Sequence, residues 1–323
     1  MPSTASSPST VSAIVATYNG ERFVGETLQS LLDQKRPPIE VVVCDDGSSD
    51  GTLDVVRSFG DAVTLIEQPN AGVSAARNHA ASKATGDVLA FVDQDDLWEP
   101  ERLEVQLDQL ARRPELGLVY ADSWIIDGEG QVQGRRRDHL PYAEGHVFGA
   151  LCETNFIPIE TLSIPTAIFR ELGGFDERAR YVEDWEICLR IARSYPIGFH
   201  PEPLGRYRIH GENLSYNMEA ILAEYASILE DLPQRIPDLT EAERDQAARV
   251  LRRRCGELAW YAVKRRDRAE TERWLARARP IRPRSLGTKI AFFRTLLGAL
   301  PEPLAERLGH ALERRGLFGS VRS

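Results

Sequence analysis

Residues 11–92 alternate between short runs rich in β-branched residues and segments with helical periodicity. The runs that indicate strands cover residues 11–16, 39–44, 63–66 and 87–92, and the segments that indicate helices cover residues 21–32, 52–59 and 73–84. Strands and helices that alternate at this spacing build βαβ units and a doubly wound sheet. The sequence therefore predicts an α/β fold with a mostly parallel, Rossmann-like sheet.

The pattern is less regular after residue 92. Helical periodicity recurs over residues 99–112 and 182–194, and strands are expected over residues 116–121, 163–169 and 204–209, with a hairpin turn at 127–130 and an Arg-rich loop at 135–137. From residue 219 onward every stretch is helical in character and is separated from the next by prolines. We expect a flexible leader over residues 1–10, an α/β domain over residues 11–218 and a helical C-terminal region over residues 219–323.

The charge of the chain is uneven. The formal net charge is -9; residues 1–218 carry 19 Lys and Arg against 34 Asp and Glu, and residues 219–323 carry 21 against 15. An acidic main domain argues against general affinity for nucleic acid. The four cysteines form no C-x-x-C pair, the leader lacks a signal-peptide pattern, and no run reaches the roughly 20 apolar residues of a spanning helix. We expect a cytoplasmic protein.

A carboxylate cluster follows directly on the apolar run that ends at Val92. The segment Asp93-Gln94-Asp95-Asp96 places three carboxylates in four positions, where a buried strand would leave the core. These carboxylates repel one another unless a cation or a proton intervenes, and hard divalent cations prefer oxygen ligands. The alternative is a solvated turn or a set of helix caps before Pro100. We favour a metal site.

Four motifs in register extend this interpretation. They are the first strand with Thr17-Tyr18-Asn19, the segment 43–52 with Asp45-Asp46-Gly47-Ser48, the segment 70–78 with Arg77-Asn78, and the carboxylate cluster. In this order and spacing they resemble glycosyltransferase family 2 of the GT-A fold, over about two thirds of the chain. The resemblance implies a glycosyltransferase that uses a nucleotide-diphosphate sugar and a divalent metal and that inverts the anomeric carbon.

The resemblance assigns donor-side roles to residues near the strand ends. Asp46 would accept a hydrogen bond from N3–H of a uracil or thymine, beside Thr17 and Asn19. The alternative for Asp45, Asp46 and Asp50 is helix capping, which fits Asp50 better than Asp46. Arg77 would turn its guanidinium toward the diphosphate, as a planar and permanently charged partner. Its alternative is a surface helix arginine. A UDP-sugar is the favoured donor.

Metal ligation is expected from the carboxylate cluster and from the end of the domain. Asp95 would coordinate Mn²⁺ or Mg²⁺ directly, and Asp93 would reach the metal or the donor ribose. The segment 207–215 resembles the family's third metal or phosphate contact, with His210 as the ligand and Arg208 as a weaker phosphate contact. For His210, a neutral role at the surface is an equal alternative.

The acceptor side is expected at the segment Tyr181-Val182-Glu183-Asp184-Trp185-Glu186, which resembles the family's acidic pair at the start of a helix. Asp184 would be the general base, with Glu183 and Trp185 beside the acceptor. The alternative is that these carboxylates only complement the helix dipole. Sugar, lipid-linked or other hydroxyl compounds are candidate acceptors, in the synthesis of a polysaccharide or glycoconjugate.

Other function classes fit less well. The turn after the first strand has one glycine, so it lacks the dinucleotide-binding G-x-G-x-x-G pattern, and a P-loop sequence is absent. A non-catalytic protein that binds nucleotide sugars, or a scaffold that uses the helical tail, remains open. Two roles are open for the helical tail. It could contact the inner face of the membrane through residues 289–297, or it could bind another protein or a second copy of the chain.

Overall fold

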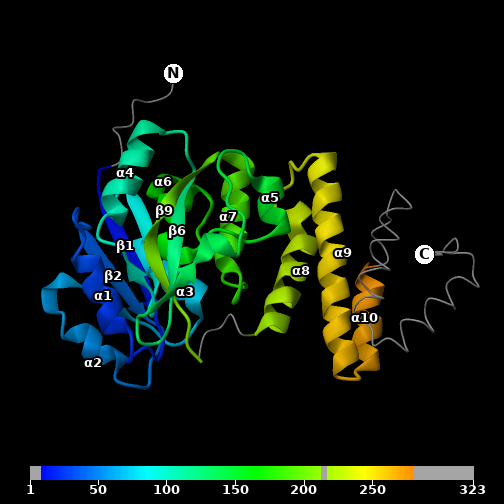
Figure 1. Ribbon diagram of the computed structural model, residues 1–323, viewed down its shortest axis with the longest axis horizontal. Coiled ribbons are helices and arrows are strands. Elements are labelled where there is room, and N and C mark those ends of the chain that lie inside the picture. The colour runs from blue at the N-terminus through cyan, green and yellow to red at the C-terminus, as the bar shows by residue number, and fades with distance from the viewer. Residues whose placement is uncertain (1–8, 212–216, 279–323) are drawn as a thin grey trace, which may run out of the picture. The chain divides into compact units, whose positions relative to one another are not determined.

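The computed structural model describes residues 9–211 and 217–278 (Figure 1). The chain divides into two compact units, Met1–Tyr216 and Asn217–Ser323. Within the described part of the first unit, nine strands form one sheet, and the described part of the second unit is helical. The assignment of functions to the ranges 1–10, 11–218 and 219–323 stays a prediction.

The first half of the sheet is parallel. β1 (Val11–Thr17) lies between β2 (Glu40–Asp45) and β4 (Val88–Asp93), and β3 (Thr64–Glu67) pairs with β2 on its other side. These strands are almost wholly buried apart from β3, because α/β crossovers cover both faces of a parallel sheet. The expected α/β fold with a mostly parallel sheet is confirmed.

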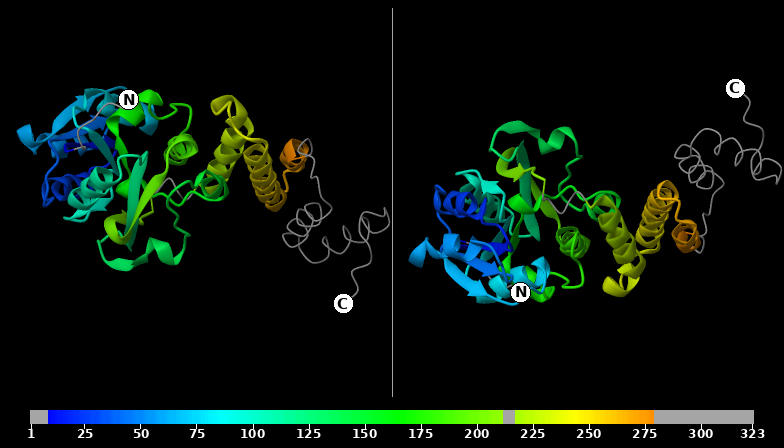
Figure 2. Two further views of the ribbon diagram at one scale, coloured as in Figure 1. Left: turned by 90° about the horizontal axis from the view of Figure 1, so that it is seen from above. Right: turned by 90° about the horizontal axis from the view of Figure 1, so that it is seen from below.

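Helices cover the two faces of these strands (Figures 1 and 2). On one face, α1 (Val24–Leu32), α2 (Thr52–Arg57) and α4 (Arg102–Arg112) pack their apolar residues against alternate residues of β1, β2 and β4. On the other face, α3 (Val73–Lys83) packs against β1 and β2, and Phe91 of β4 packs against Phe169. The short 3₁₀ helix η1 spans Gly60–Ala62.

The second half of the sheet is mixed. Its order continues from β4 through β8, β6, β9 and β5, and β7 pairs with β6 as a hairpin. The β6–β9 pair is parallel, and the other pairs of this half are antiparallel. The bounds of these strands are β5 Leu97–Trp98, β6 Leu118–Ile126, β7 Val132–Arg135, β8 Ser163–Pro165 and β9 Ile197–Arg208.

One expected strand is largely wrong. The segment 163–169 forms a strand only as far as Pro165, and α6 (Thr166–Glu171) follows at once. Proline has no N–H for a sheet ladder, so the strand ends there. The remaining elements of this unit are η2 Arg136–Asp138, α5 Phe148–Glu153, η3 Ile159–Thr161 and α7 Glu183–Ser194.

Ser9 and Thr10 fall within the range expected to be a flexible leader. Both donate their backbone N–H groups to Asp87, and the carbonyl of Thr10 accepts from Val88. These two residues therefore continue the line of β1. Residues 1–8 lie outside the described ranges.

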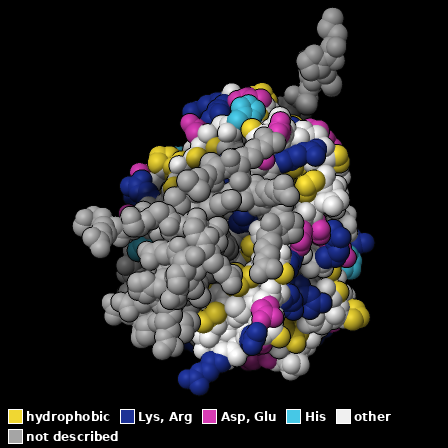
Figure 3. All heavy atoms as spheres, turned by 90° about the vertical axis from the view of Figure 1, so that its right-hand side faces the viewer, with side chains coloured by type: hydrophobic (Ala, Val, Ile, Leu, Met, Phe, Trp, Pro, Cys, Tyr) yellow, Lys and Arg dark blue, Asp and Glu magenta, His cyan; other side chains and the backbone are white. Residues whose placement is uncertain are grey.

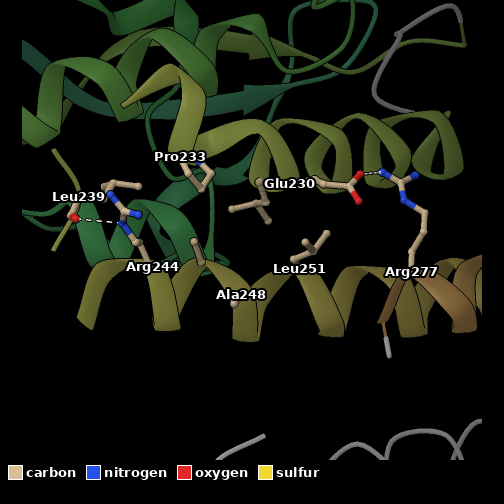
Figure 4. Close-up of a pocket in the computed structure, with 9 residues that line it drawn as sticks. Glu230, Pro233, Leu239, Arg244, Ala248, Leu251 and Arg277 are labelled. Atoms are coloured by element: carbon tan, nitrogen blue, oxygen red, sulfur yellow. Dashed lines mark hydrogen bonds and ion pairs between the residues drawn. The ribbon is translucent and has the colours of Figure 1, made fainter. Parts of the chain in front are cut away.

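The second unit contains α8 (Met218–Arg235), α9 (Glu241–Lys264) and α10 (Arg268–Ala278), with α9 packed against both of the others. A capping box between Thr240 and Glu243 starts α9. A recess of about 240 Å³ lies between α8 and α9, where Glu230 pairs with Arg277 (Figure 4).

Two observations bear on the expected membrane contact. None of the described helices is both long enough and apolar enough to cross a bilayer. On the face drawn in Figure 3, acidic and basic side chains are interspersed among the described residues. The apolar segment 289–297, which carries the membrane alternative, lies outside the described residues, so membrane contact and oligomer formation stay predictions.

Candidate active site

The ends of three neighbouring strands lie at one edge of the sheet. The register pairs Thr17 of β1 with Asp45 of β2, and Ala16 of β1 with Asp93 of β4. The loops after these strands are therefore neighbours, at the position where open α/β sheets bind ligands. The donor-side residues expected from the sequence fall in these loops.

Asp46 organises the loop that precedes α3. Its buried carboxylate accepts hydrogen bonds from the backbone N–H groups of Ala71 and Gly72 and from the Gln68 amide, each at 2.8 Å. The Oδ2 atom takes part in only one of these bonds, so it can accept another. The expected contact with a nucleobase fits this geometry and stays a prediction.

Thr17 and Asn19 differ in what they present. The buried hydroxyl of Thr17 donates to Asp45 at 3.1 Å, so this side chain stabilises the turn after β2. Asn19 is exposed with a positive φ of 49°, and its Oδ1 accepts from the N–H of Ser49 at 2.8 Å. Asn19 lines an open recess together with residues 21, 22, 49 and 50, so it is the better placed of the two to meet a ligand.

Gln94 joins the loop after β1 to the carboxylate cluster. Its amide accepts from the N–H of Tyr18 at 2.9 Å and donates to the carbonyl of Tyr18 at 3.1 Å. A Cβ atom on Gly20 would overlap this amide, so any other residue at position 20 would displace the side chain of Gln94 from this contact. Sequence reasoning missed Gln94, because its type gives no sign that its amide pairs with the backbone N–H and C=O of a residue 76 positions earlier.

The three carboxylates after β4 lie together. Asp93, Asp95 and Asp96 each offer an oxygen within 4.8 Å of the others. Asp96 is 1% exposed; its Oδ1 accepts the backbone N–H of Arg208 at 2.8 Å, and its Oδ2 has no hydrogen bond among the described residues. Burial raises the pKa of Asp96 well above its usual range, and the charges of Asp95, Glu160 and Asp93 add to this.

Asp95 is the second residue of this cluster whose pKa is raised. Burial and the charge of Asp93 raise the pKa of Asp95, against an opposing effect of His210. A divalent cation would offset the repulsion and use the unpaired oxygen of Asp96, so the residues present fit a metal ion with oxygen ligands.

His210 lies against this cluster, and the guanidinium of Arg208 is buried beside it. The His210 Nε2 atom is 2.7 Å from the Oδ2 of Asp95, and the imidazole packs on Phe23 with ring centroids 4.8 Å apart. Arg208 is 1% exposed and donates to the carbonyl of Asp95 at 2.8 Å and to Glu26 at 2.7 Å. The guanidinium of Arg208 thus fixes the backbone of the cluster, and its expected phosphate contact stays a prediction.

Arg77 likewise forms ion pairs with other residues of the protein. Its guanidinium is 2% exposed, binds Asp93, and donates to Glu183 at 2.5 Å, and the expected contact with the diphosphate stays a prediction. Burial would lower the pKa of Arg77, but the charges of Asp93 and Glu183 reverse this effect and raise it above its usual value. Arg77 therefore connects the carboxylate cluster to the start of α7.

Asp184 stands at the first turn of α7. Its Oδ1 accepts the N–H of Trp185 at 2.6 Å, and its Oδ2 accepts from Asn155 at 3.2 Å. Burial and the charge of Glu183 raise the pKa of Asp184 to about 7, and Arg77 opposes this shift. A carboxylate with this pKa can take up and release a proton near neutral pH. Asn155 was missed, because it lies in a loop without periodicity.

The two neighbours of Asp184 have internal positions. Trp185 is completely buried and donates its indole N–H to the carbonyl of Leu151 at 2.7 Å, so it does not form an open wall of the site. Glu183 is 7% exposed and holds Arg77. Both residues support the start of α7 from within.

The comparisons with known proteins agree with this arrangement. Residues 12–161 match the family model for glycosyl transferase family 2. The chain is 28% identical over 223 residues to the uncharacterized glycosyltransferase RT0329 of Rickettsia typhi, a match that covers 68% of this chain and 70% of that protein. The chain is a glycosyltransferase with a glycosyl transferase family 2 domain. The predicted family and enzyme class are confirmed, which favours a glycosyltransferase over a non-catalytic binding protein.

Solved structures show that this glycosyltransferase has the GT-A fold. TarS 1–349 of S. aureus, in complex with UDP-GlcNAc, superimposes with a TM-score of 0.63 at 20% identity, over 89% of this chain and 82% of TarS 1–349. The mannosyltransferase PcManGT of Pyrobaculum calidifontis, in complex with GDP-Man and Mn²⁺, gives a TM-score of 0.56 at 22% identity, over 90% and 85% of the two chains.

Proposed function

We propose that this glycosyltransferase moves a sugar from a nucleotide-diphosphate sugar to an acceptor hydroxyl, with inversion at the anomeric carbon and with the aid of a divalent cation. One observation carries the proposal. The carboxylate cluster after β4 and the proton acceptor Asp184 are held in one network, because Arg77 binds both Asp93 and Glu183.

The donor end of the proposed reaction rests on the carboxylate cluster. Asp95 and Asp93 would hold the cation, together with His210. When bound, Mn²⁺ or Mg²⁺ would act as a Lewis acid that offsets the charge growing on the diphosphate. Arg208 and Gln94 would keep the backbone of this loop in place, so that the ligand oxygens stay preorganised.

The acceptor end rests on Asp184. Its carboxylate takes the proton of the acceptor hydroxyl, while the hydroxyl oxygen forms a bond to the anomeric carbon on the face opposite the diphosphate. The bond from the anomeric carbon to the diphosphate oxygen breaks, and its electron pair leaves with the diphosphate. Asn155 and the N–H of Trp185 hold the carboxylate in position during this displacement.

A UDP-sugar is the donor that we favour. Asp46 retains a free acceptor position for the N3–H of uracil, and the structurally similar TarS was solved with UDP-GlcNAc. PcManGT was solved with GDP-Man and Mn²⁺, which supports a guanine nucleotide as the second candidate and a divalent cation in either case. The product would be part of a polysaccharide or another glycoconjugate.

Binding and turnover test the proposal together. We expect one class of nucleotide sugar, in the presence of Mn²⁺, to raise the melting temperature, because ligand at 100 times its Kd stabilises the folded state by about 2.7 kcal/mol. The same donor should release its nucleotide diphosphate when an acceptor is supplied. If UDP-, dTDP- and GDP-sugars all leave the melting temperature unchanged with Mn²⁺ or Mg²⁺, the proposal is wrong.

A further inference from the structure

The three consecutive arginines after the β6–β7 hairpin have different surroundings. Arg135 donates to the buried carboxylate of Asp122 at 2.9 Å, and Arg137 lies 3.6 Å from the same carboxylate. Both also donate to the carbonyl of Pro201. These two side chains anchor the segment, whereas Arg136 between them points elsewhere.

The guanidinium of Arg136 makes no hydrogen bond with the part of the chain that the structure describes. Its nearest partner is Glu160, at 3.7 Å, and its Cζ lies 5.0 Å from the centroid of the Tyr207 ring. The side chain is 22% exposed. A guanidinium has five N–H donors, and a partly buried one normally uses several of them. The donors of Arg136 are therefore available to a ligand.

Glu160 accepts no hydrogen bond from Arg136. Its carboxylate is completely buried, and neither of its oxygens has a hydrogen bond among the described residues. The same carboxylate also acts electrostatically on the buried guanidinium of Arg102, which stacks on Trp98 at 3.8 Å. Of the two guanidiniums that interact with Glu160, that of Arg102 is completely buried, whereas that of Arg136 is partly exposed to solvent.

The chain brings Arg136 close to the proposed base. A single segment serves both groups, because Asn155 donates to Asp184 and Glu160, five residues later, is the partner of Arg136. The charges of Asp184 and Arg136 also act on one another. An acceptor whose hydroxyl meets Asp184 would therefore bring its neighbouring substituents toward Arg136.

We propose that Arg136 binds a carboxylate or phosphate group on the acceptor, so that the enzyme selects an anionic acceptor. The inference rests on the proposed role of Asp184 at the acceptor site. A guanidinium presents two parallel N–H donors that match a carboxylate or phosphate in a bidentate pair. The ring of Tyr207 supports the guanidinium from one side and leaves its edge for this pair.

Binding of three small sugars to the full chain tests this inference. The probes are methyl glucuronide, methyl glucoside 6-phosphate and neutral methyl glucoside, titrated at low ionic strength. We expect at least one anionic probe to bind about tenfold or more tightly than the neutral one, as for a charge-assisted pair. Comparison of the two anionic probes identifies which anion is preferred, and added salt should weaken the preference.

Substitutions of Arg136 are compared with one of a surface arginine. Arg136→Gln should remove the preference for the anion, Arg136→Lys should retain part of it, and Arg112→Gln, at an exposed arginine that pairs with Asp108 within α4, should leave it unchanged. Equal binding of all three probes, no binding of any, or a preference that survives Arg136→Gln overturns the inference. Nucleotide-sugar stabilisation with Mn²⁺, measured on the same proteins, separates the two proposals. Its absence from the wild type contradicts the proposed function, whereas its presence without an anion preference contradicts only the role of Arg136.

Discussion

The guanidinium of Arg77 lies 2.5 Å from the carboxylate of Glu183, which is 106 residues further along the chain, and its second nitrogen binds Asp93. This contact joins the helix after β3 to the first turn of α7. Arg77 thereby links Asp93 of the proposed metal site to Glu183, the neighbour of the proposed base Asp184. The geometry of the site therefore depends on a residue that need not touch either substrate.

Arg77→Met should destabilise the protein strongly. Removal of the guanidinium leaves the carboxylate of Glu183, which is 7% exposed, without its partner. Breaking a buried ion pair from one side costs about 3–5 kcal/mol. Urea unfolding measures the change in the free energy of unfolding. Arg77→Lys, which retains the positive charge but not the planar guanidinium, should be destabilised less. A loss below about 1 kcal/mol for Arg77→Met would contradict the structural role.

The rate of transfer should rise with pH through neutrality. The proposed base must be ionised, and the pKa of Asp184 is raised to about 7 by burial and by Glu183. The value of kcat/KM should therefore fall about tenfold for each pH unit below 7 and level off above it. A profile that stays flat between pH 5 and 8 would exclude Asp184 as the titrating base.

The same group should affect stability in the opposite direction. Because the pKa of Asp184 is higher in the folded state than its ordinary value of 3.8, the protonated form favours folding. This contribution is complete below pH 3.8 and is lost as the pH rises through 7. Unfolding of wild type and Asp184→Asn at pH 5 and pH 8 should show that the variant lacks this part of the pH dependence.

Glu183→Gln should shift the pH profile of transfer toward acid. The negative charge of Glu183 raises the pKa of Asp184, and Arg77 lowers it. Neutralising Glu183 removes the first effect and leaves the charge of Arg77 less compensated, so both changes favour the ionised form of Asp184. The midpoint of the ascending limb reports the shift. A midpoint that moves to higher pH would show that the electrostatic assignment is wrong.

Metal affinity should depend on Asp95 more than on His210. Asp95→Asn removes a charged oxygen from the cluster, whereas His210→Ala removes a group that lies 2.7 Å from Asp95. We expect Asp95→Asn to abolish measurable Mn²⁺ binding, and His210→Ala to weaken it about 10- to 100-fold. Calorimetric titration of Mn²⁺ decides, and unchanged affinity in Asp95→Asn would remove the proposed metal site.

Much of the first half of the fold could be predicted from the sequence. The strands that begin at Val11, Glu40 and Val88 are continuous apolar runs, which only a sheet covered on both faces accommodates. The error at residues 163–169 has a local cause that was visible, since Pro165 ends the strand. Some boundaries elsewhere moved by a few residues, as with α4, which begins at Arg102 instead of residue 99, whereas β9 begins at Ile197, well before the expected start at residue 204.

The candidate site could be predicted as a set of residue types but not as a set of contacts. The acidic cluster stands out because three carboxylates in four positions are unusual in any turn. The position of Arg77 between Asp93 and Glu183, and the burial of Arg208 and Trp185, depend on how distant segments meet. The proposed roles of residues such as Gln94, Asn155 and Arg136 depend on tertiary contacts, which their residue types do not indicate in the sequence.

The measurement that tests the account most directly is a comparison of donor affinity and transfer rate in Asp184→Asn. The asparagine keeps the shape of the side chain, but it has one acceptor oxygen in place of two, so it retains only one of the hydrogen bonds from Trp185 and Asn155, and it cannot take up a proton from the acceptor. We predict that the Kd of the donor with Mn²⁺ changes by no more than several-fold, while transfer falls by about a hundredfold or more. Transfer that continues at close to the wild-type rate, or an equal loss of affinity and rate, would contradict the assignment of Asp184 as the base.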